Sequence, residues 1–368
     1  MKFSTLQENL AKGLQTVARA VPTKSPMPIL TNVLISAENG RLKLSATNLE
    51  TAITTYVNAS IDKEGSITVP ARLIKEFIIN LSPSTIIAEL ESDILHLKSD
   101  KTKSRLNGIS AEDYPKLPEV SKKAKHIDIK PEDLVNAASV VAFAAGTDSS
   151  RPVFTGVYLK YKKNKLTIAA TDGFRLSEKT IKVEGDAEDF SVIIPAKIFL
   201  EVARIFASSQ ESIKMIMNEN ENLVLFEAED TLITTVILDG QYPDYTKIIP
   251  SESIVTAKFP SEEFLEAVRL TNIFAKEGNS TIKVCLNPDG EIKIVSLEAE
   301  TGKHESTFPA EVEGESLEMA FNSKYLLDFL SNVKSDQIVF SANGNLSPCV
   351  LKSNGHDNFL HIIMPVQL

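Results

Sequence analysis

Six stretches of the chain carry the apolar spacing of an amphipathic helix, and they recur at nearly equal intervals. In each stretch, apolar residues stand three or four positions apart, which places them on one face of a 3.6-residue helix. The midpoints fall near residues 13, 77, 140, 202, 268 and 328, so consecutive midpoints are 60 to 66 residues apart. The apolar positions are Leu6, Leu10, Leu14, Val17 and Val21; Leu73, Ile74, Phe77, Ile78 and Leu81; Leu134, Ala138, Val141 and Ala145; Ile198, Phe199, Val202, Ile205 and Phe206; Phe264, Leu265, Val268 and Ile273; and Tyr325, Leu326, Phe329, Leu330 and Val333. A period of this length indicates repeated structural units.

Strand patterns fill the intervals between the predicted helices. Residues 40–47 alternate polar and apolar side chains, and similar segments recur at 165–171 and 291–297. Such alternation is typical of a half-buried strand. Val69-Pro70-Ala71 precedes the second helix, Ile194-Pro195-Ala196 the fourth and Phe321-Asn322-Ser323 the sixth. Proline and small polar residues suit these positions, because the first backbone amides of a helix have no partner inside it.

One repeat holds a helix and three or four short strands, which is too little to bury a core, so we expect two repeats to form one domain. The predicted domains are 1–120, 121–251 and 252–368, with linkers near 119–124 and 250–253. The predicted fold class is α+β, with two helices packed on paired antiparallel sheets in each domain. Three such domains in a row make a curved body, and a second copy joined head to tail could close it into a ring.

The charge balance limits what the chain can bind. The 368 residues carry a net charge of −10 at pH 7, which argues against a protein that coats nucleic acid through bulk charge. The predicted helices are nearly neutral, so a locally less acidic face remains open. Cys285 and Cys349 are expected as buried strand residues, and the five histidines form no metal-ligand motif. We expect no signal peptide, no membrane span and a cytoplasmic location.

The short motifs favour binding over catalysis. Residues 171–176, Thr-Asp-Gly-Phe-Arg-Leu, place Asp172 near Arg175, which could serve acid–base chemistry, but an Asp-Gly turn after a strand explains them as well. Phosphate-binding glycine loops and nucleophile motifs are absent from the sequence, so we expect neither an enzyme nor a cofactor. The C-terminal segment 359–368 stays apolar almost to its end. We expect a final strand followed by an exposed apolar surface suited to short peptides.

Several of these segments together resemble one family, the bacterial beta sliding clamps, which are the beta subunits of DNA polymerase III. The matching segments are Met1-Lys2-Phe3, Met27-Pro28-Ile29-Leu30, Val69-Pro70-Ala71-Arg72, Thr171-Asp172-Gly173 with Arg175-Leu176, Asp239-Gly240 with Tyr242-Pro243-Asp244-Tyr245, and Met364-Pro365. They occur in order from residue 1 to the last residues of the chain. The resemblance implies three DNA-clamp domains per chain and a homodimeric ring that encircles double-stranded DNA without sequence preference and gives a polymerase its processivity.

The resemblance also implies partners and sites. The partners would be the DNA polymerase III alpha subunit, the clamp loader, and other polymerases and repair proteins with clamp-binding motifs. The chain would not bind a membrane. The DNA-facing residues would be Lys12, Lys24, Arg72 and Lys197, and the dimer interface would include Leu106, Ile273 and Phe274. A peptide-binding groove between the second and third domains would comprise Phe154, Thr171, Gly173, Phe174, Arg175, Leu176, Pro243, Ile248, Leu346, Pro348, Ile362, Met364, Pro365 and Val366. Phe154 and Gln367 depart from the residues usual in the family, which affects the expected motif preference.

Two other functions remain open from the sequence. One is an enzyme that uses Asp172 and Arg175 in a cleft between domains. The other is a peptide-binding scaffold that keeps the fold but does not encircle DNA.

Overall fold

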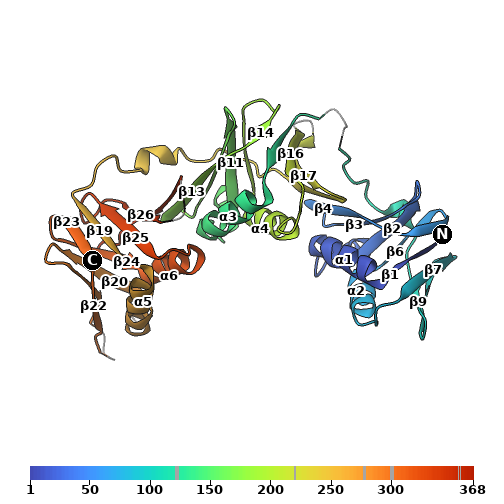
Figure 1. Ribbon diagram of the computed structural model, residues 1–368, viewed down its shortest axis with the longest axis horizontal. Helices are drawn as coiled ribbons and strands as arrows, with labels where there is room; N and C mark the ends of the chain where they lie inside the picture. Colours follow the sequence, from blue (N-terminus) through green and yellow to red (C-terminus); the bar gives the residue numbers. More distant parts are fainter. Residues whose placement is uncertain (121–123, 219–220, 277–278, 299–301, 355, 357) are drawn as a thin grey trace. The chain divides into compact units, whose positions relative to one another are not determined.

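The six predicted helices are all present. The computed structural model describes residues 1–120, 124–218, 221–276, 279–298, 302–354, 356 and 358–368. The helices are α1 (Gln7–Val17), α2 (Ala71–Ile79), α3 (Pro131–Val141), α4 (Ala196–Ile205), α5 (Ser261–Ala275) and α6 (Ser323–Asn332) (Figure 1). Short 3-10 turns are η1 (Ala18–Ala20), η2 (Pro28–Thr31), η3 (Ala111–Asp113), η4 (Ala142–Ala144), η5 (Pro152–Thr155) and η7 (Tyr245–Ile248). The helical spacing in the sequence therefore located each α-helix of the described residues.

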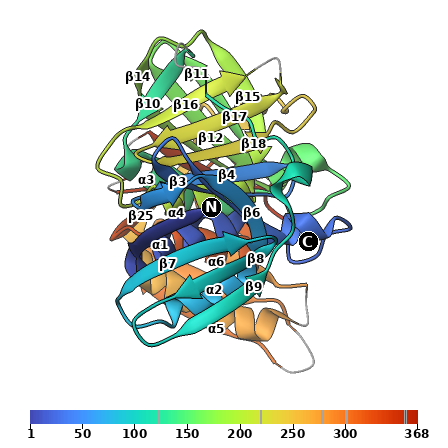
Figure 2. The same cartoon turned by 90° about the vertical axis from the view of Figure 1, so that its right-hand side faces the viewer.

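The chain divides into two compact units, and unit 1 comprises residues 1–131, 184–188 and 201–237. Its five-stranded antiparallel sheet has the order β5-β1-β7-β8-β9, and its nine-stranded sheet has the order β14-β10-β16-β17-β18-β4-β3-β2-β6. The first sheet contains β1 (Lys2–Leu6), β5 (Ser60–Lys63), β7 (Thr85–Glu91), β8 (Ile94–Lys98) and β9 (Lys103–Asn107), of which β7, β8 and β9 lie side by side in Figure 2. The second contains β2 (Asn32–Glu38), β3 (Arg41–Thr47), β4 (Thr51–Val57), β6 (Gly65–Pro70), β10 (His126–Ile129), β14 (Glu184–Gly185), β16 (Ile213–Asn218), β17 (Leu223–Ala228) and β18 (Thr231–Val236).

Unit 2 comprises residues 132–183, 189–200 and 238–368. Its nine-stranded antiparallel sheet has the order β15-β11-β12-β13-β27-β26-β25-β19-β23, and its four-stranded sheet has the order β22-β21-β20-β24. The first contains β11 (Gly156–Lys162), β12 (Lys165–Thr171), β13 (Arg175–Lys182), β15 (Phe190–Pro195), β19 (Val255–Pro260), β23 (Glu311–Gly314), β25 (Gln337–Ala342), β26 (Cys349–Ser353) and β27 (Phe359–Ile363). The second contains β20 (Thr281–Asn287), β21 (Glu291–Ser296), β22 (Glu305–Pro309) and β24 (Leu317–Asn322).

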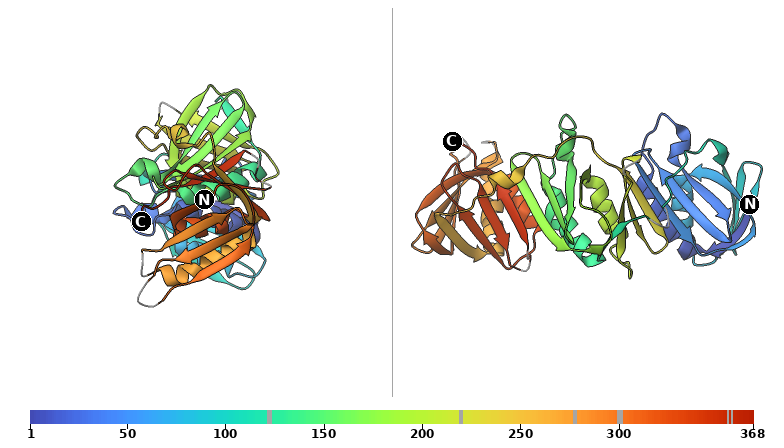
Figure 3. Two further views of the ribbon diagram at one scale, coloured as in Figure 1. Left: turned by 90° about the vertical axis from the view of Figure 1, so that its left-hand side faces the viewer. Right: turned by 90° about the horizontal axis from the view of Figure 1, so that it is seen from above.

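The helices cover the sheets in pairs, as the α+β prediction requires. In unit 1, α1 packs beside α2 and across β3 and β4. In unit 2, α5 packs beside α6 and across β20, β21 and β22, and the orange strands of this sheet lie next to α5 in the left view of Figure 3. The buried faces are apolar, with Leu10, Leu14 and Val17 inside α1 and Phe264 and Val268 inside α5. The fold class is therefore confirmed.

Two strand pairs join segments that are far apart in the sequence. In unit 1, β18 pairs with β4, with Ile233 across from Ile53. In unit 2, β13 pairs with β27, with Ser177 across from His361. Each pair continues one sheet from one predicted domain into the next, so main-chain hydrogen bonds hold the junctions together.

Some finer expectations have mixed outcomes. Cys349 is buried in β26 as expected, but Cys285 in β20 is only partly buried, because it lies on the opposite face of the strand from the buried Val284 and Leu286. The predicted linker at 250–253 lies outside the helices and strands, whereas residues 121–123 of the other linker are outside the described residues. The three predicted domain boundaries remain a prediction.

Candidate functional site

The candidate site lies in unit 2, where β13, β27 and β26 end side by side. The register pairs Arg175 with Ile363, and Ile363 in turn with Cys349. One residue beyond these pairs, Phe174, Met364 and Pro348 therefore form a row across the three strand ends. The backbone N–H of Met364 donates to the Phe174 carbonyl over 2.8 Å, which extends the ladder by one step. Three of the predicted groove residues are thus brought together by strand register alone.

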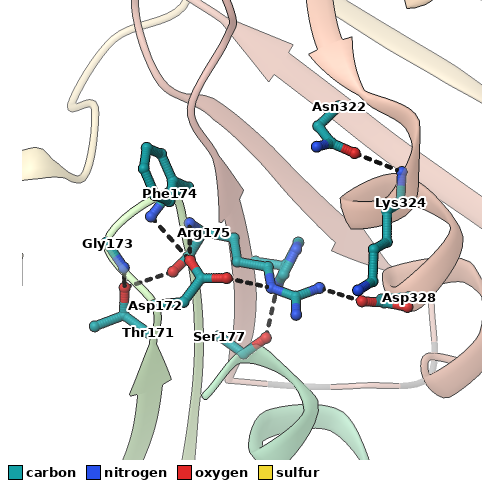
Figure 4. Close-up of polar contacts among 10 residues, drawn as sticks. Thr171, Asp172, Gly173, Phe174, Arg175, Ser177, Asn322, Lys324 and Asp328 are labelled. Atoms are coloured by element: carbon teal, nitrogen blue, oxygen red, sulfur yellow. Dashed lines mark hydrogen bonds and ion pairs between the residues drawn. The ribbon is translucent and has the colours of Figure 1, made fainter. Parts of the chain in front are cut away.

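A tight turn at the start of this row presents Phe174 to solvent. The Asp172 carboxylate accepts hydrogen bonds from the backbone N–H groups of Phe174 (2.9 Å) and Arg175 (3.0 Å), and the Thr171 hydroxyl accepts one from Gly173 (Figure 4). Gly173 has φ of +93°, a conformation that L side chains rarely adopt. The Asp-Gly turn expected from the sequence is therefore present, and Asp172 acts as its cap.

Arg175 fixes this turn to helix α6. Its side chain is buried, and it donates to the carboxylates of Asp172 (3.0 Å) and Asp328 (2.6 Å) (Figure 4). The rings of Tyr325 and Phe143 lie 4.8 and 5.7 Å from the guanidinium. A buried cation needs such partners, because an isolated charge in the interior is costly. The contacts of Asp172 and Arg175 are thus those of a structural clamp between the turn and α6.

The surface beside the turn is apolar and partly aromatic. Phe174 is 58% exposed and stacks on Tyr325 of α6, with ring centroids 6.4 Å apart. Leu346 is 59% exposed, and Ile248 and Val366 are also exposed. Tyr325 was not predicted as a site residue, because its place in the sixth apolar stripe assigned it to the core. Only its contact with Phe174, which is distant in the sequence, reveals the second role.

Other predicted groove residues lie beneath this surface. Leu176 and Ile362 are fully buried in one apolar cluster with Tyr242, Tyr245 and Val350. The Tyr245 hydroxyl donates to the Glu178 carboxylate over 2.5 Å, and the Tyr242 ring stacks on Tyr158. Burial raises the pKa of both tyrosines above the ordinary range. The apolar cluster forms a buried floor, while Phe154, Pro348, Met364 and Pro365 are half-buried and Gly173 and Pro243 are exposed.

A hollow with charged walls adjoins Phe174. Its volume is about 490 Å³, and its lining includes Arg151, Phe154, Phe174, Lys324 and Tyr325. The Arg151 guanidinium lies 5.3 Å from the Phe154 ring centroid. The carboxylates of Asp148, Asp172 and Asp328 also line the hollow, so its walls combine aromatic rings with charges of both signs. Such a hollow suits an extended peptide whose apolar side chains meet the rings and whose polar groups meet the charges.

His361 lies on the opposite face of the same strands. It is fully buried between the rings of Phe143 and Phe329, at 5.3 and 4.9 Å, and its Nδ1 is hydrogen bonded to the Ser177 hydroxyl at 2.7 Å. Burial, together with the charge of Arg175, lowers the pKa of His361 to about 3. The imidazole therefore stays neutral and has a packing role.

The predicted DNA-facing residues are all exposed. Lys12 lies on α1, Arg72 at the start of α2 and Lys24 in the segment after η1, all in unit 1. Lys197 lies at the start of α4 in unit 2. Arg72 donates to Glu76 of its own helix over 2.9 Å, and its side chain is 88% exposed. Exposed surface cations of this kind can contact phosphates without reading the base sequence.

The predicted interface residues differ in exposure. Ile273 on α5 is 61% exposed, and Phe274 is half-buried with its ring stacked on His304 at 5.2 Å. Leu106 of β9 is only 6% exposed, because its side chain points to the inner face of its sheet. Of the three residues, Ile273 offers the most apolar surface to a second copy.

The described residues contain neither a cluster of metal ligands nor a membrane-spanning helix. No group of three or more His, Cys, Asp and Glu side chains there could hold a metal ion. Within the same residues, no helix combines the length and the apolar character needed to cross a membrane.

Comparison with known proteins places this repeated architecture in the DNA clamps. Family models of the N-terminal, central and C-terminal domains of the DNA polymerase III beta subunit match residues 1–118, 128–244 and 246–367. The beta sliding clamps of Bacillus subtilis (strain 168) and Synechococcus elongatus are 30% and 31% identical, and each alignment covers 100% of both chains. The crystal structure of the Bacillus subtilis sliding clamp has a TM-score of 0.94 at 30% identity, covering 100% of this chain and 99% of that chain. A Pseudomonas aeruginosa clamp bound to griselimycin has a TM-score of 0.93 at 27% identity, with 100% of both chains covered.

The three clamp domains define a DNA clamp. The chain belongs to the family of bacterial beta sliding clamps, the beta subunits of DNA polymerase III. Its function is that of a DNA sliding clamp in replication, and the non-encircling peptide-binding scaffold left open by the sequence is not favoured.

Proposed function

We propose that two copies of the chain close head to tail around duplex DNA and hold partner proteins in a groove of unit 2. The partners in this proposal are the DNA polymerase III alpha subunit, the clamp loader, and other polymerases and repair proteins with clamp-binding motifs. The single observation that carries the groove is the row formed by Phe174, Met364 and Pro348 across three strand ends. The row leaves apolar surface exposed beside the Phe174–Tyr325 stack.

The groove suits partners that exchange. An anchoring leucine and one aromatic side chain of a peptide would bury a few hundred Å². At about 25 cal/mol per Å², less the cost of ordering the peptide, this gives roughly micromolar affinity. Leu176, Ile362 and Tyr242 are packed in one buried cluster beneath the surface, so the floor is already formed before a peptide binds, which reduces the cost of reorganisation.

The test of the groove is a fluorescence-anisotropy titration with a labelled Gln-Leu-x-Leu-Phe-type peptide. We expect micromolar binding to the full chain and its loss in a variant lacking residues 364–368. Leu346→Ala should weaken binding several-fold, because Leu346 is exposed beside the site. Leu49→Ala is the matched control, since Leu49 is 57% exposed but lies in unit 1. Equal affinity of the truncated and full-length chains would refute the groove.

The strand pairing supports self-association. At one junction β4 pairs with β18, and at the next β13 pairs with β27; each pair joins the fourth strand of one predicted domain to the last strand of the following domain. The corresponding strands that remain are β22 and β9, and each is the last strand of its sheet. A second copy could pair its β9 with β22, and edge strands favour such addition. The shared register then places His304 across from Ser104 of the second copy.

Solution mass tests the ring. We expect the mass of a dimer for the unmodified chain and of a monomer for Ile273→Arg combined with Phe274→Arg. A charge buried in an apolar interface is costly, whereas the exposed Ile273 position tolerates it in the monomer. An unchanged mass of the variant would refute the assignment of these residues.

DNA contacts in this proposal are few and weak. Each phosphate contact adds about 0.9 to the salt dependence of binding, and many contacts would slow sliding. Lys12, Lys24, Arg72 and Lys197 are the proposed contacts. A clamp loaded on a nicked circle should stay bound and should be released when the circle is linearised. A scaffold that does not encircle DNA would show no such difference.

We also propose that the chain has no catalytic activity of its own and acts in the bacterial cytoplasm, where the chromosome is replicated. Asp172 and Arg175 support this, because their contacts connect the turn to α6. We expect the unmodified chain and the variant Asp172→Asn to be equally without enzymatic activity.

A further inference from the structure

The two internal junctions are built from equivalent positions, which can be counted from the helix starts. Helices α2, α4 and α6 each begin directly after the strand that ends in Pro70, Pro195 or Asn322. The sixth residue of each helix is acidic, and these residues are Glu76, Glu201 and Asp328. The third residues are Leu73, Ile198 and Tyr325. An acidic sixth residue and an apolar or aromatic third residue therefore recur on α2, α4 and α6.

At both internal junctions the acidic residue receives an arginine from the preceding domain. Glu201 pairs with Arg19 over 2.5 Å in unit 1, and Asp328 pairs with Arg175 over 2.6 Å in unit 2. The third equivalent, Glu76, pairs with Arg72 of its own helix. Arg72 is 88% exposed, so this pair contributes little stability.

The first helices supply the facing side of each junction. Counted from the starts of α1, α3 and α5, the thirteenth positions are Arg19, Phe143 and Ile273. Arg19 contacts Glu201, and Phe143 lies beside Arg175 and thereby beside Asp328 and Tyr325. Ile273, at the same position of α5, is instead 61% exposed.

Gly146, three positions after Phe143, lies near the acidic residue Asp328. Both residues line the hollow beside Phe174. The position of α5 equivalent to Gly146 is Lys276, which is exposed. Lys276 therefore occupies the position on α5 that would face the acidic sixth residue of a second helix packed against α5.

We infer that, in the ring of the proposed function, Leu73 of one copy packs against Ile273 of the second copy and Glu76 forms an ion pair with Lys276 of the second copy. The inference rests on the proposed homodimer. Leu73 is 54% exposed in the single chain, and Glu76 lies one turn further along the same helix. The apolar contact and the opposite charges fit together at one interface, which commits this surface to a second copy of the chain.

A charge exchange tests the ion pair. Dimer dissociation is measured by sedimentation velocity over a dilution series. Glu76→Lys should raise the dissociation constant about a hundredfold, because like charges then face each other at both interfaces of the ring. Lys276→Glu should do the same, and the double variant should return to within about threefold of the unmodified chain, because the charges are again opposite.

The matched control is Glu64→Lys, which makes the same charge change in the same unit. Glu64 follows β5, which lies at the opposite edge of its sheet from β9, so its substitution should leave dimerisation unchanged. Thermal melting of every variant checks that it is folded.

The outcomes separate the inference from the proposed ring. A monomeric unmodified chain would refute the ring and the inference together. A dimeric unmodified chain whose dissociation constant is unaffected by Glu76→Lys would overturn the inference alone. Weakening by both single variants without recovery in the double variant would also overturn it.

The proposed contact between Leu73 and Ile273 is tested by a double-mutant cycle of Leu73→Ala and Ile273→Ala. Each single variant should weaken the dimer, and the second substitution should add less once the first is present. Additive effects would contradict direct packing of the two residues.

Discussion

Replacing Arg175 tests how strongly the two domains of unit 2 are clamped together. Arg175→Met keeps much of the side-chain volume but removes the hydrogen bonds to Asp172 and Asp328, which span 3.0 and 2.6 Å. The arginine side chain is 8% exposed, whereas that of Asp328 is 34% exposed, so water will screen part of the loss on the Asp328 side. Breaking a well-buried pair costs about 3–5 kcal/mol, and we expect about 2–3 kcal/mol here after that discount.

The assay is urea unfolding followed by tyrosine fluorescence. The chain has no tryptophan and seven tyrosines, and Tyr325 stacks over the Arg175 guanidinium. Local loss of the clamp should therefore change the tyrosine signal directly. Asp328→Asn and the double variant complete a cycle that isolates the coupling between Arg175 and Asp328.

The control for this cycle is Arg72→Met, and the measured quantity is the free energy of unfolding. Arg72→Met is matched in chemistry but removes an exposed pair, so its free energy of unfolding should change by less than about 0.5 kcal/mol. A coupling free energy between Arg175 and Asp328 below about 0.5 kcal/mol would refute the clamp, because exposed pairs reach that value.

Three further predictions concern the floor, the turn and the buried imidazole. Tyr245→Phe should lower the free energy of unfolding by about 1–2 kcal/mol, measured by urea titration, because Glu178 loses its donor. Gly173→Ala should cost about 1 kcal/mol or more at φ of +93° and should weaken peptide binding in the anisotropy titration, since Phe174 shifts. The depressed pKa of His361, about 3, makes stability fall as pH drops below the unfolded-state value near 6.5, because only the unfolded chain binds the proton. Between pH 7 and pH 5 this amounts to about 2 kcal/mol, and the loss should be absent in His361→Gln; an identical pH dependence in both proteins would contradict it.

The repeated fold could be predicted from the sequence because its signals are local. Leu10, Leu14 and Val17 lie within three turns of one helix, so their shared face is set by the helical period alone. The same holds for the alternating strand at residues 165–171, which became β12. Equal spacing of these local signals then revealed the domain repeat.

The exposed surface of the site could not be predicted in this way. Leu176 and Phe174 belong to one short segment, yet the first is fully buried and the second is exposed, because only the pairing of β13 with β27 decides where the sheet ends. Tyr325 and Leu73 were interpreted as core residues for a similar reason. Their exposure depends on neighbours 150 or more residues away or on a second copy, and helical periodicity contains no information about either.

The junction strands have a consequence for how this family can vary. At equivalent points of the ladders stand Ile53 and Ser177, and a hydrocarbon and a hydroxyl differ in almost every property. Both ladders nevertheless form, because main-chain amides and carbonyls supply the bonds. Natural selection can therefore exchange the side chains at a junction while the strand-to-strand connection persists. Clamps with 30% identity can therefore keep the same fold.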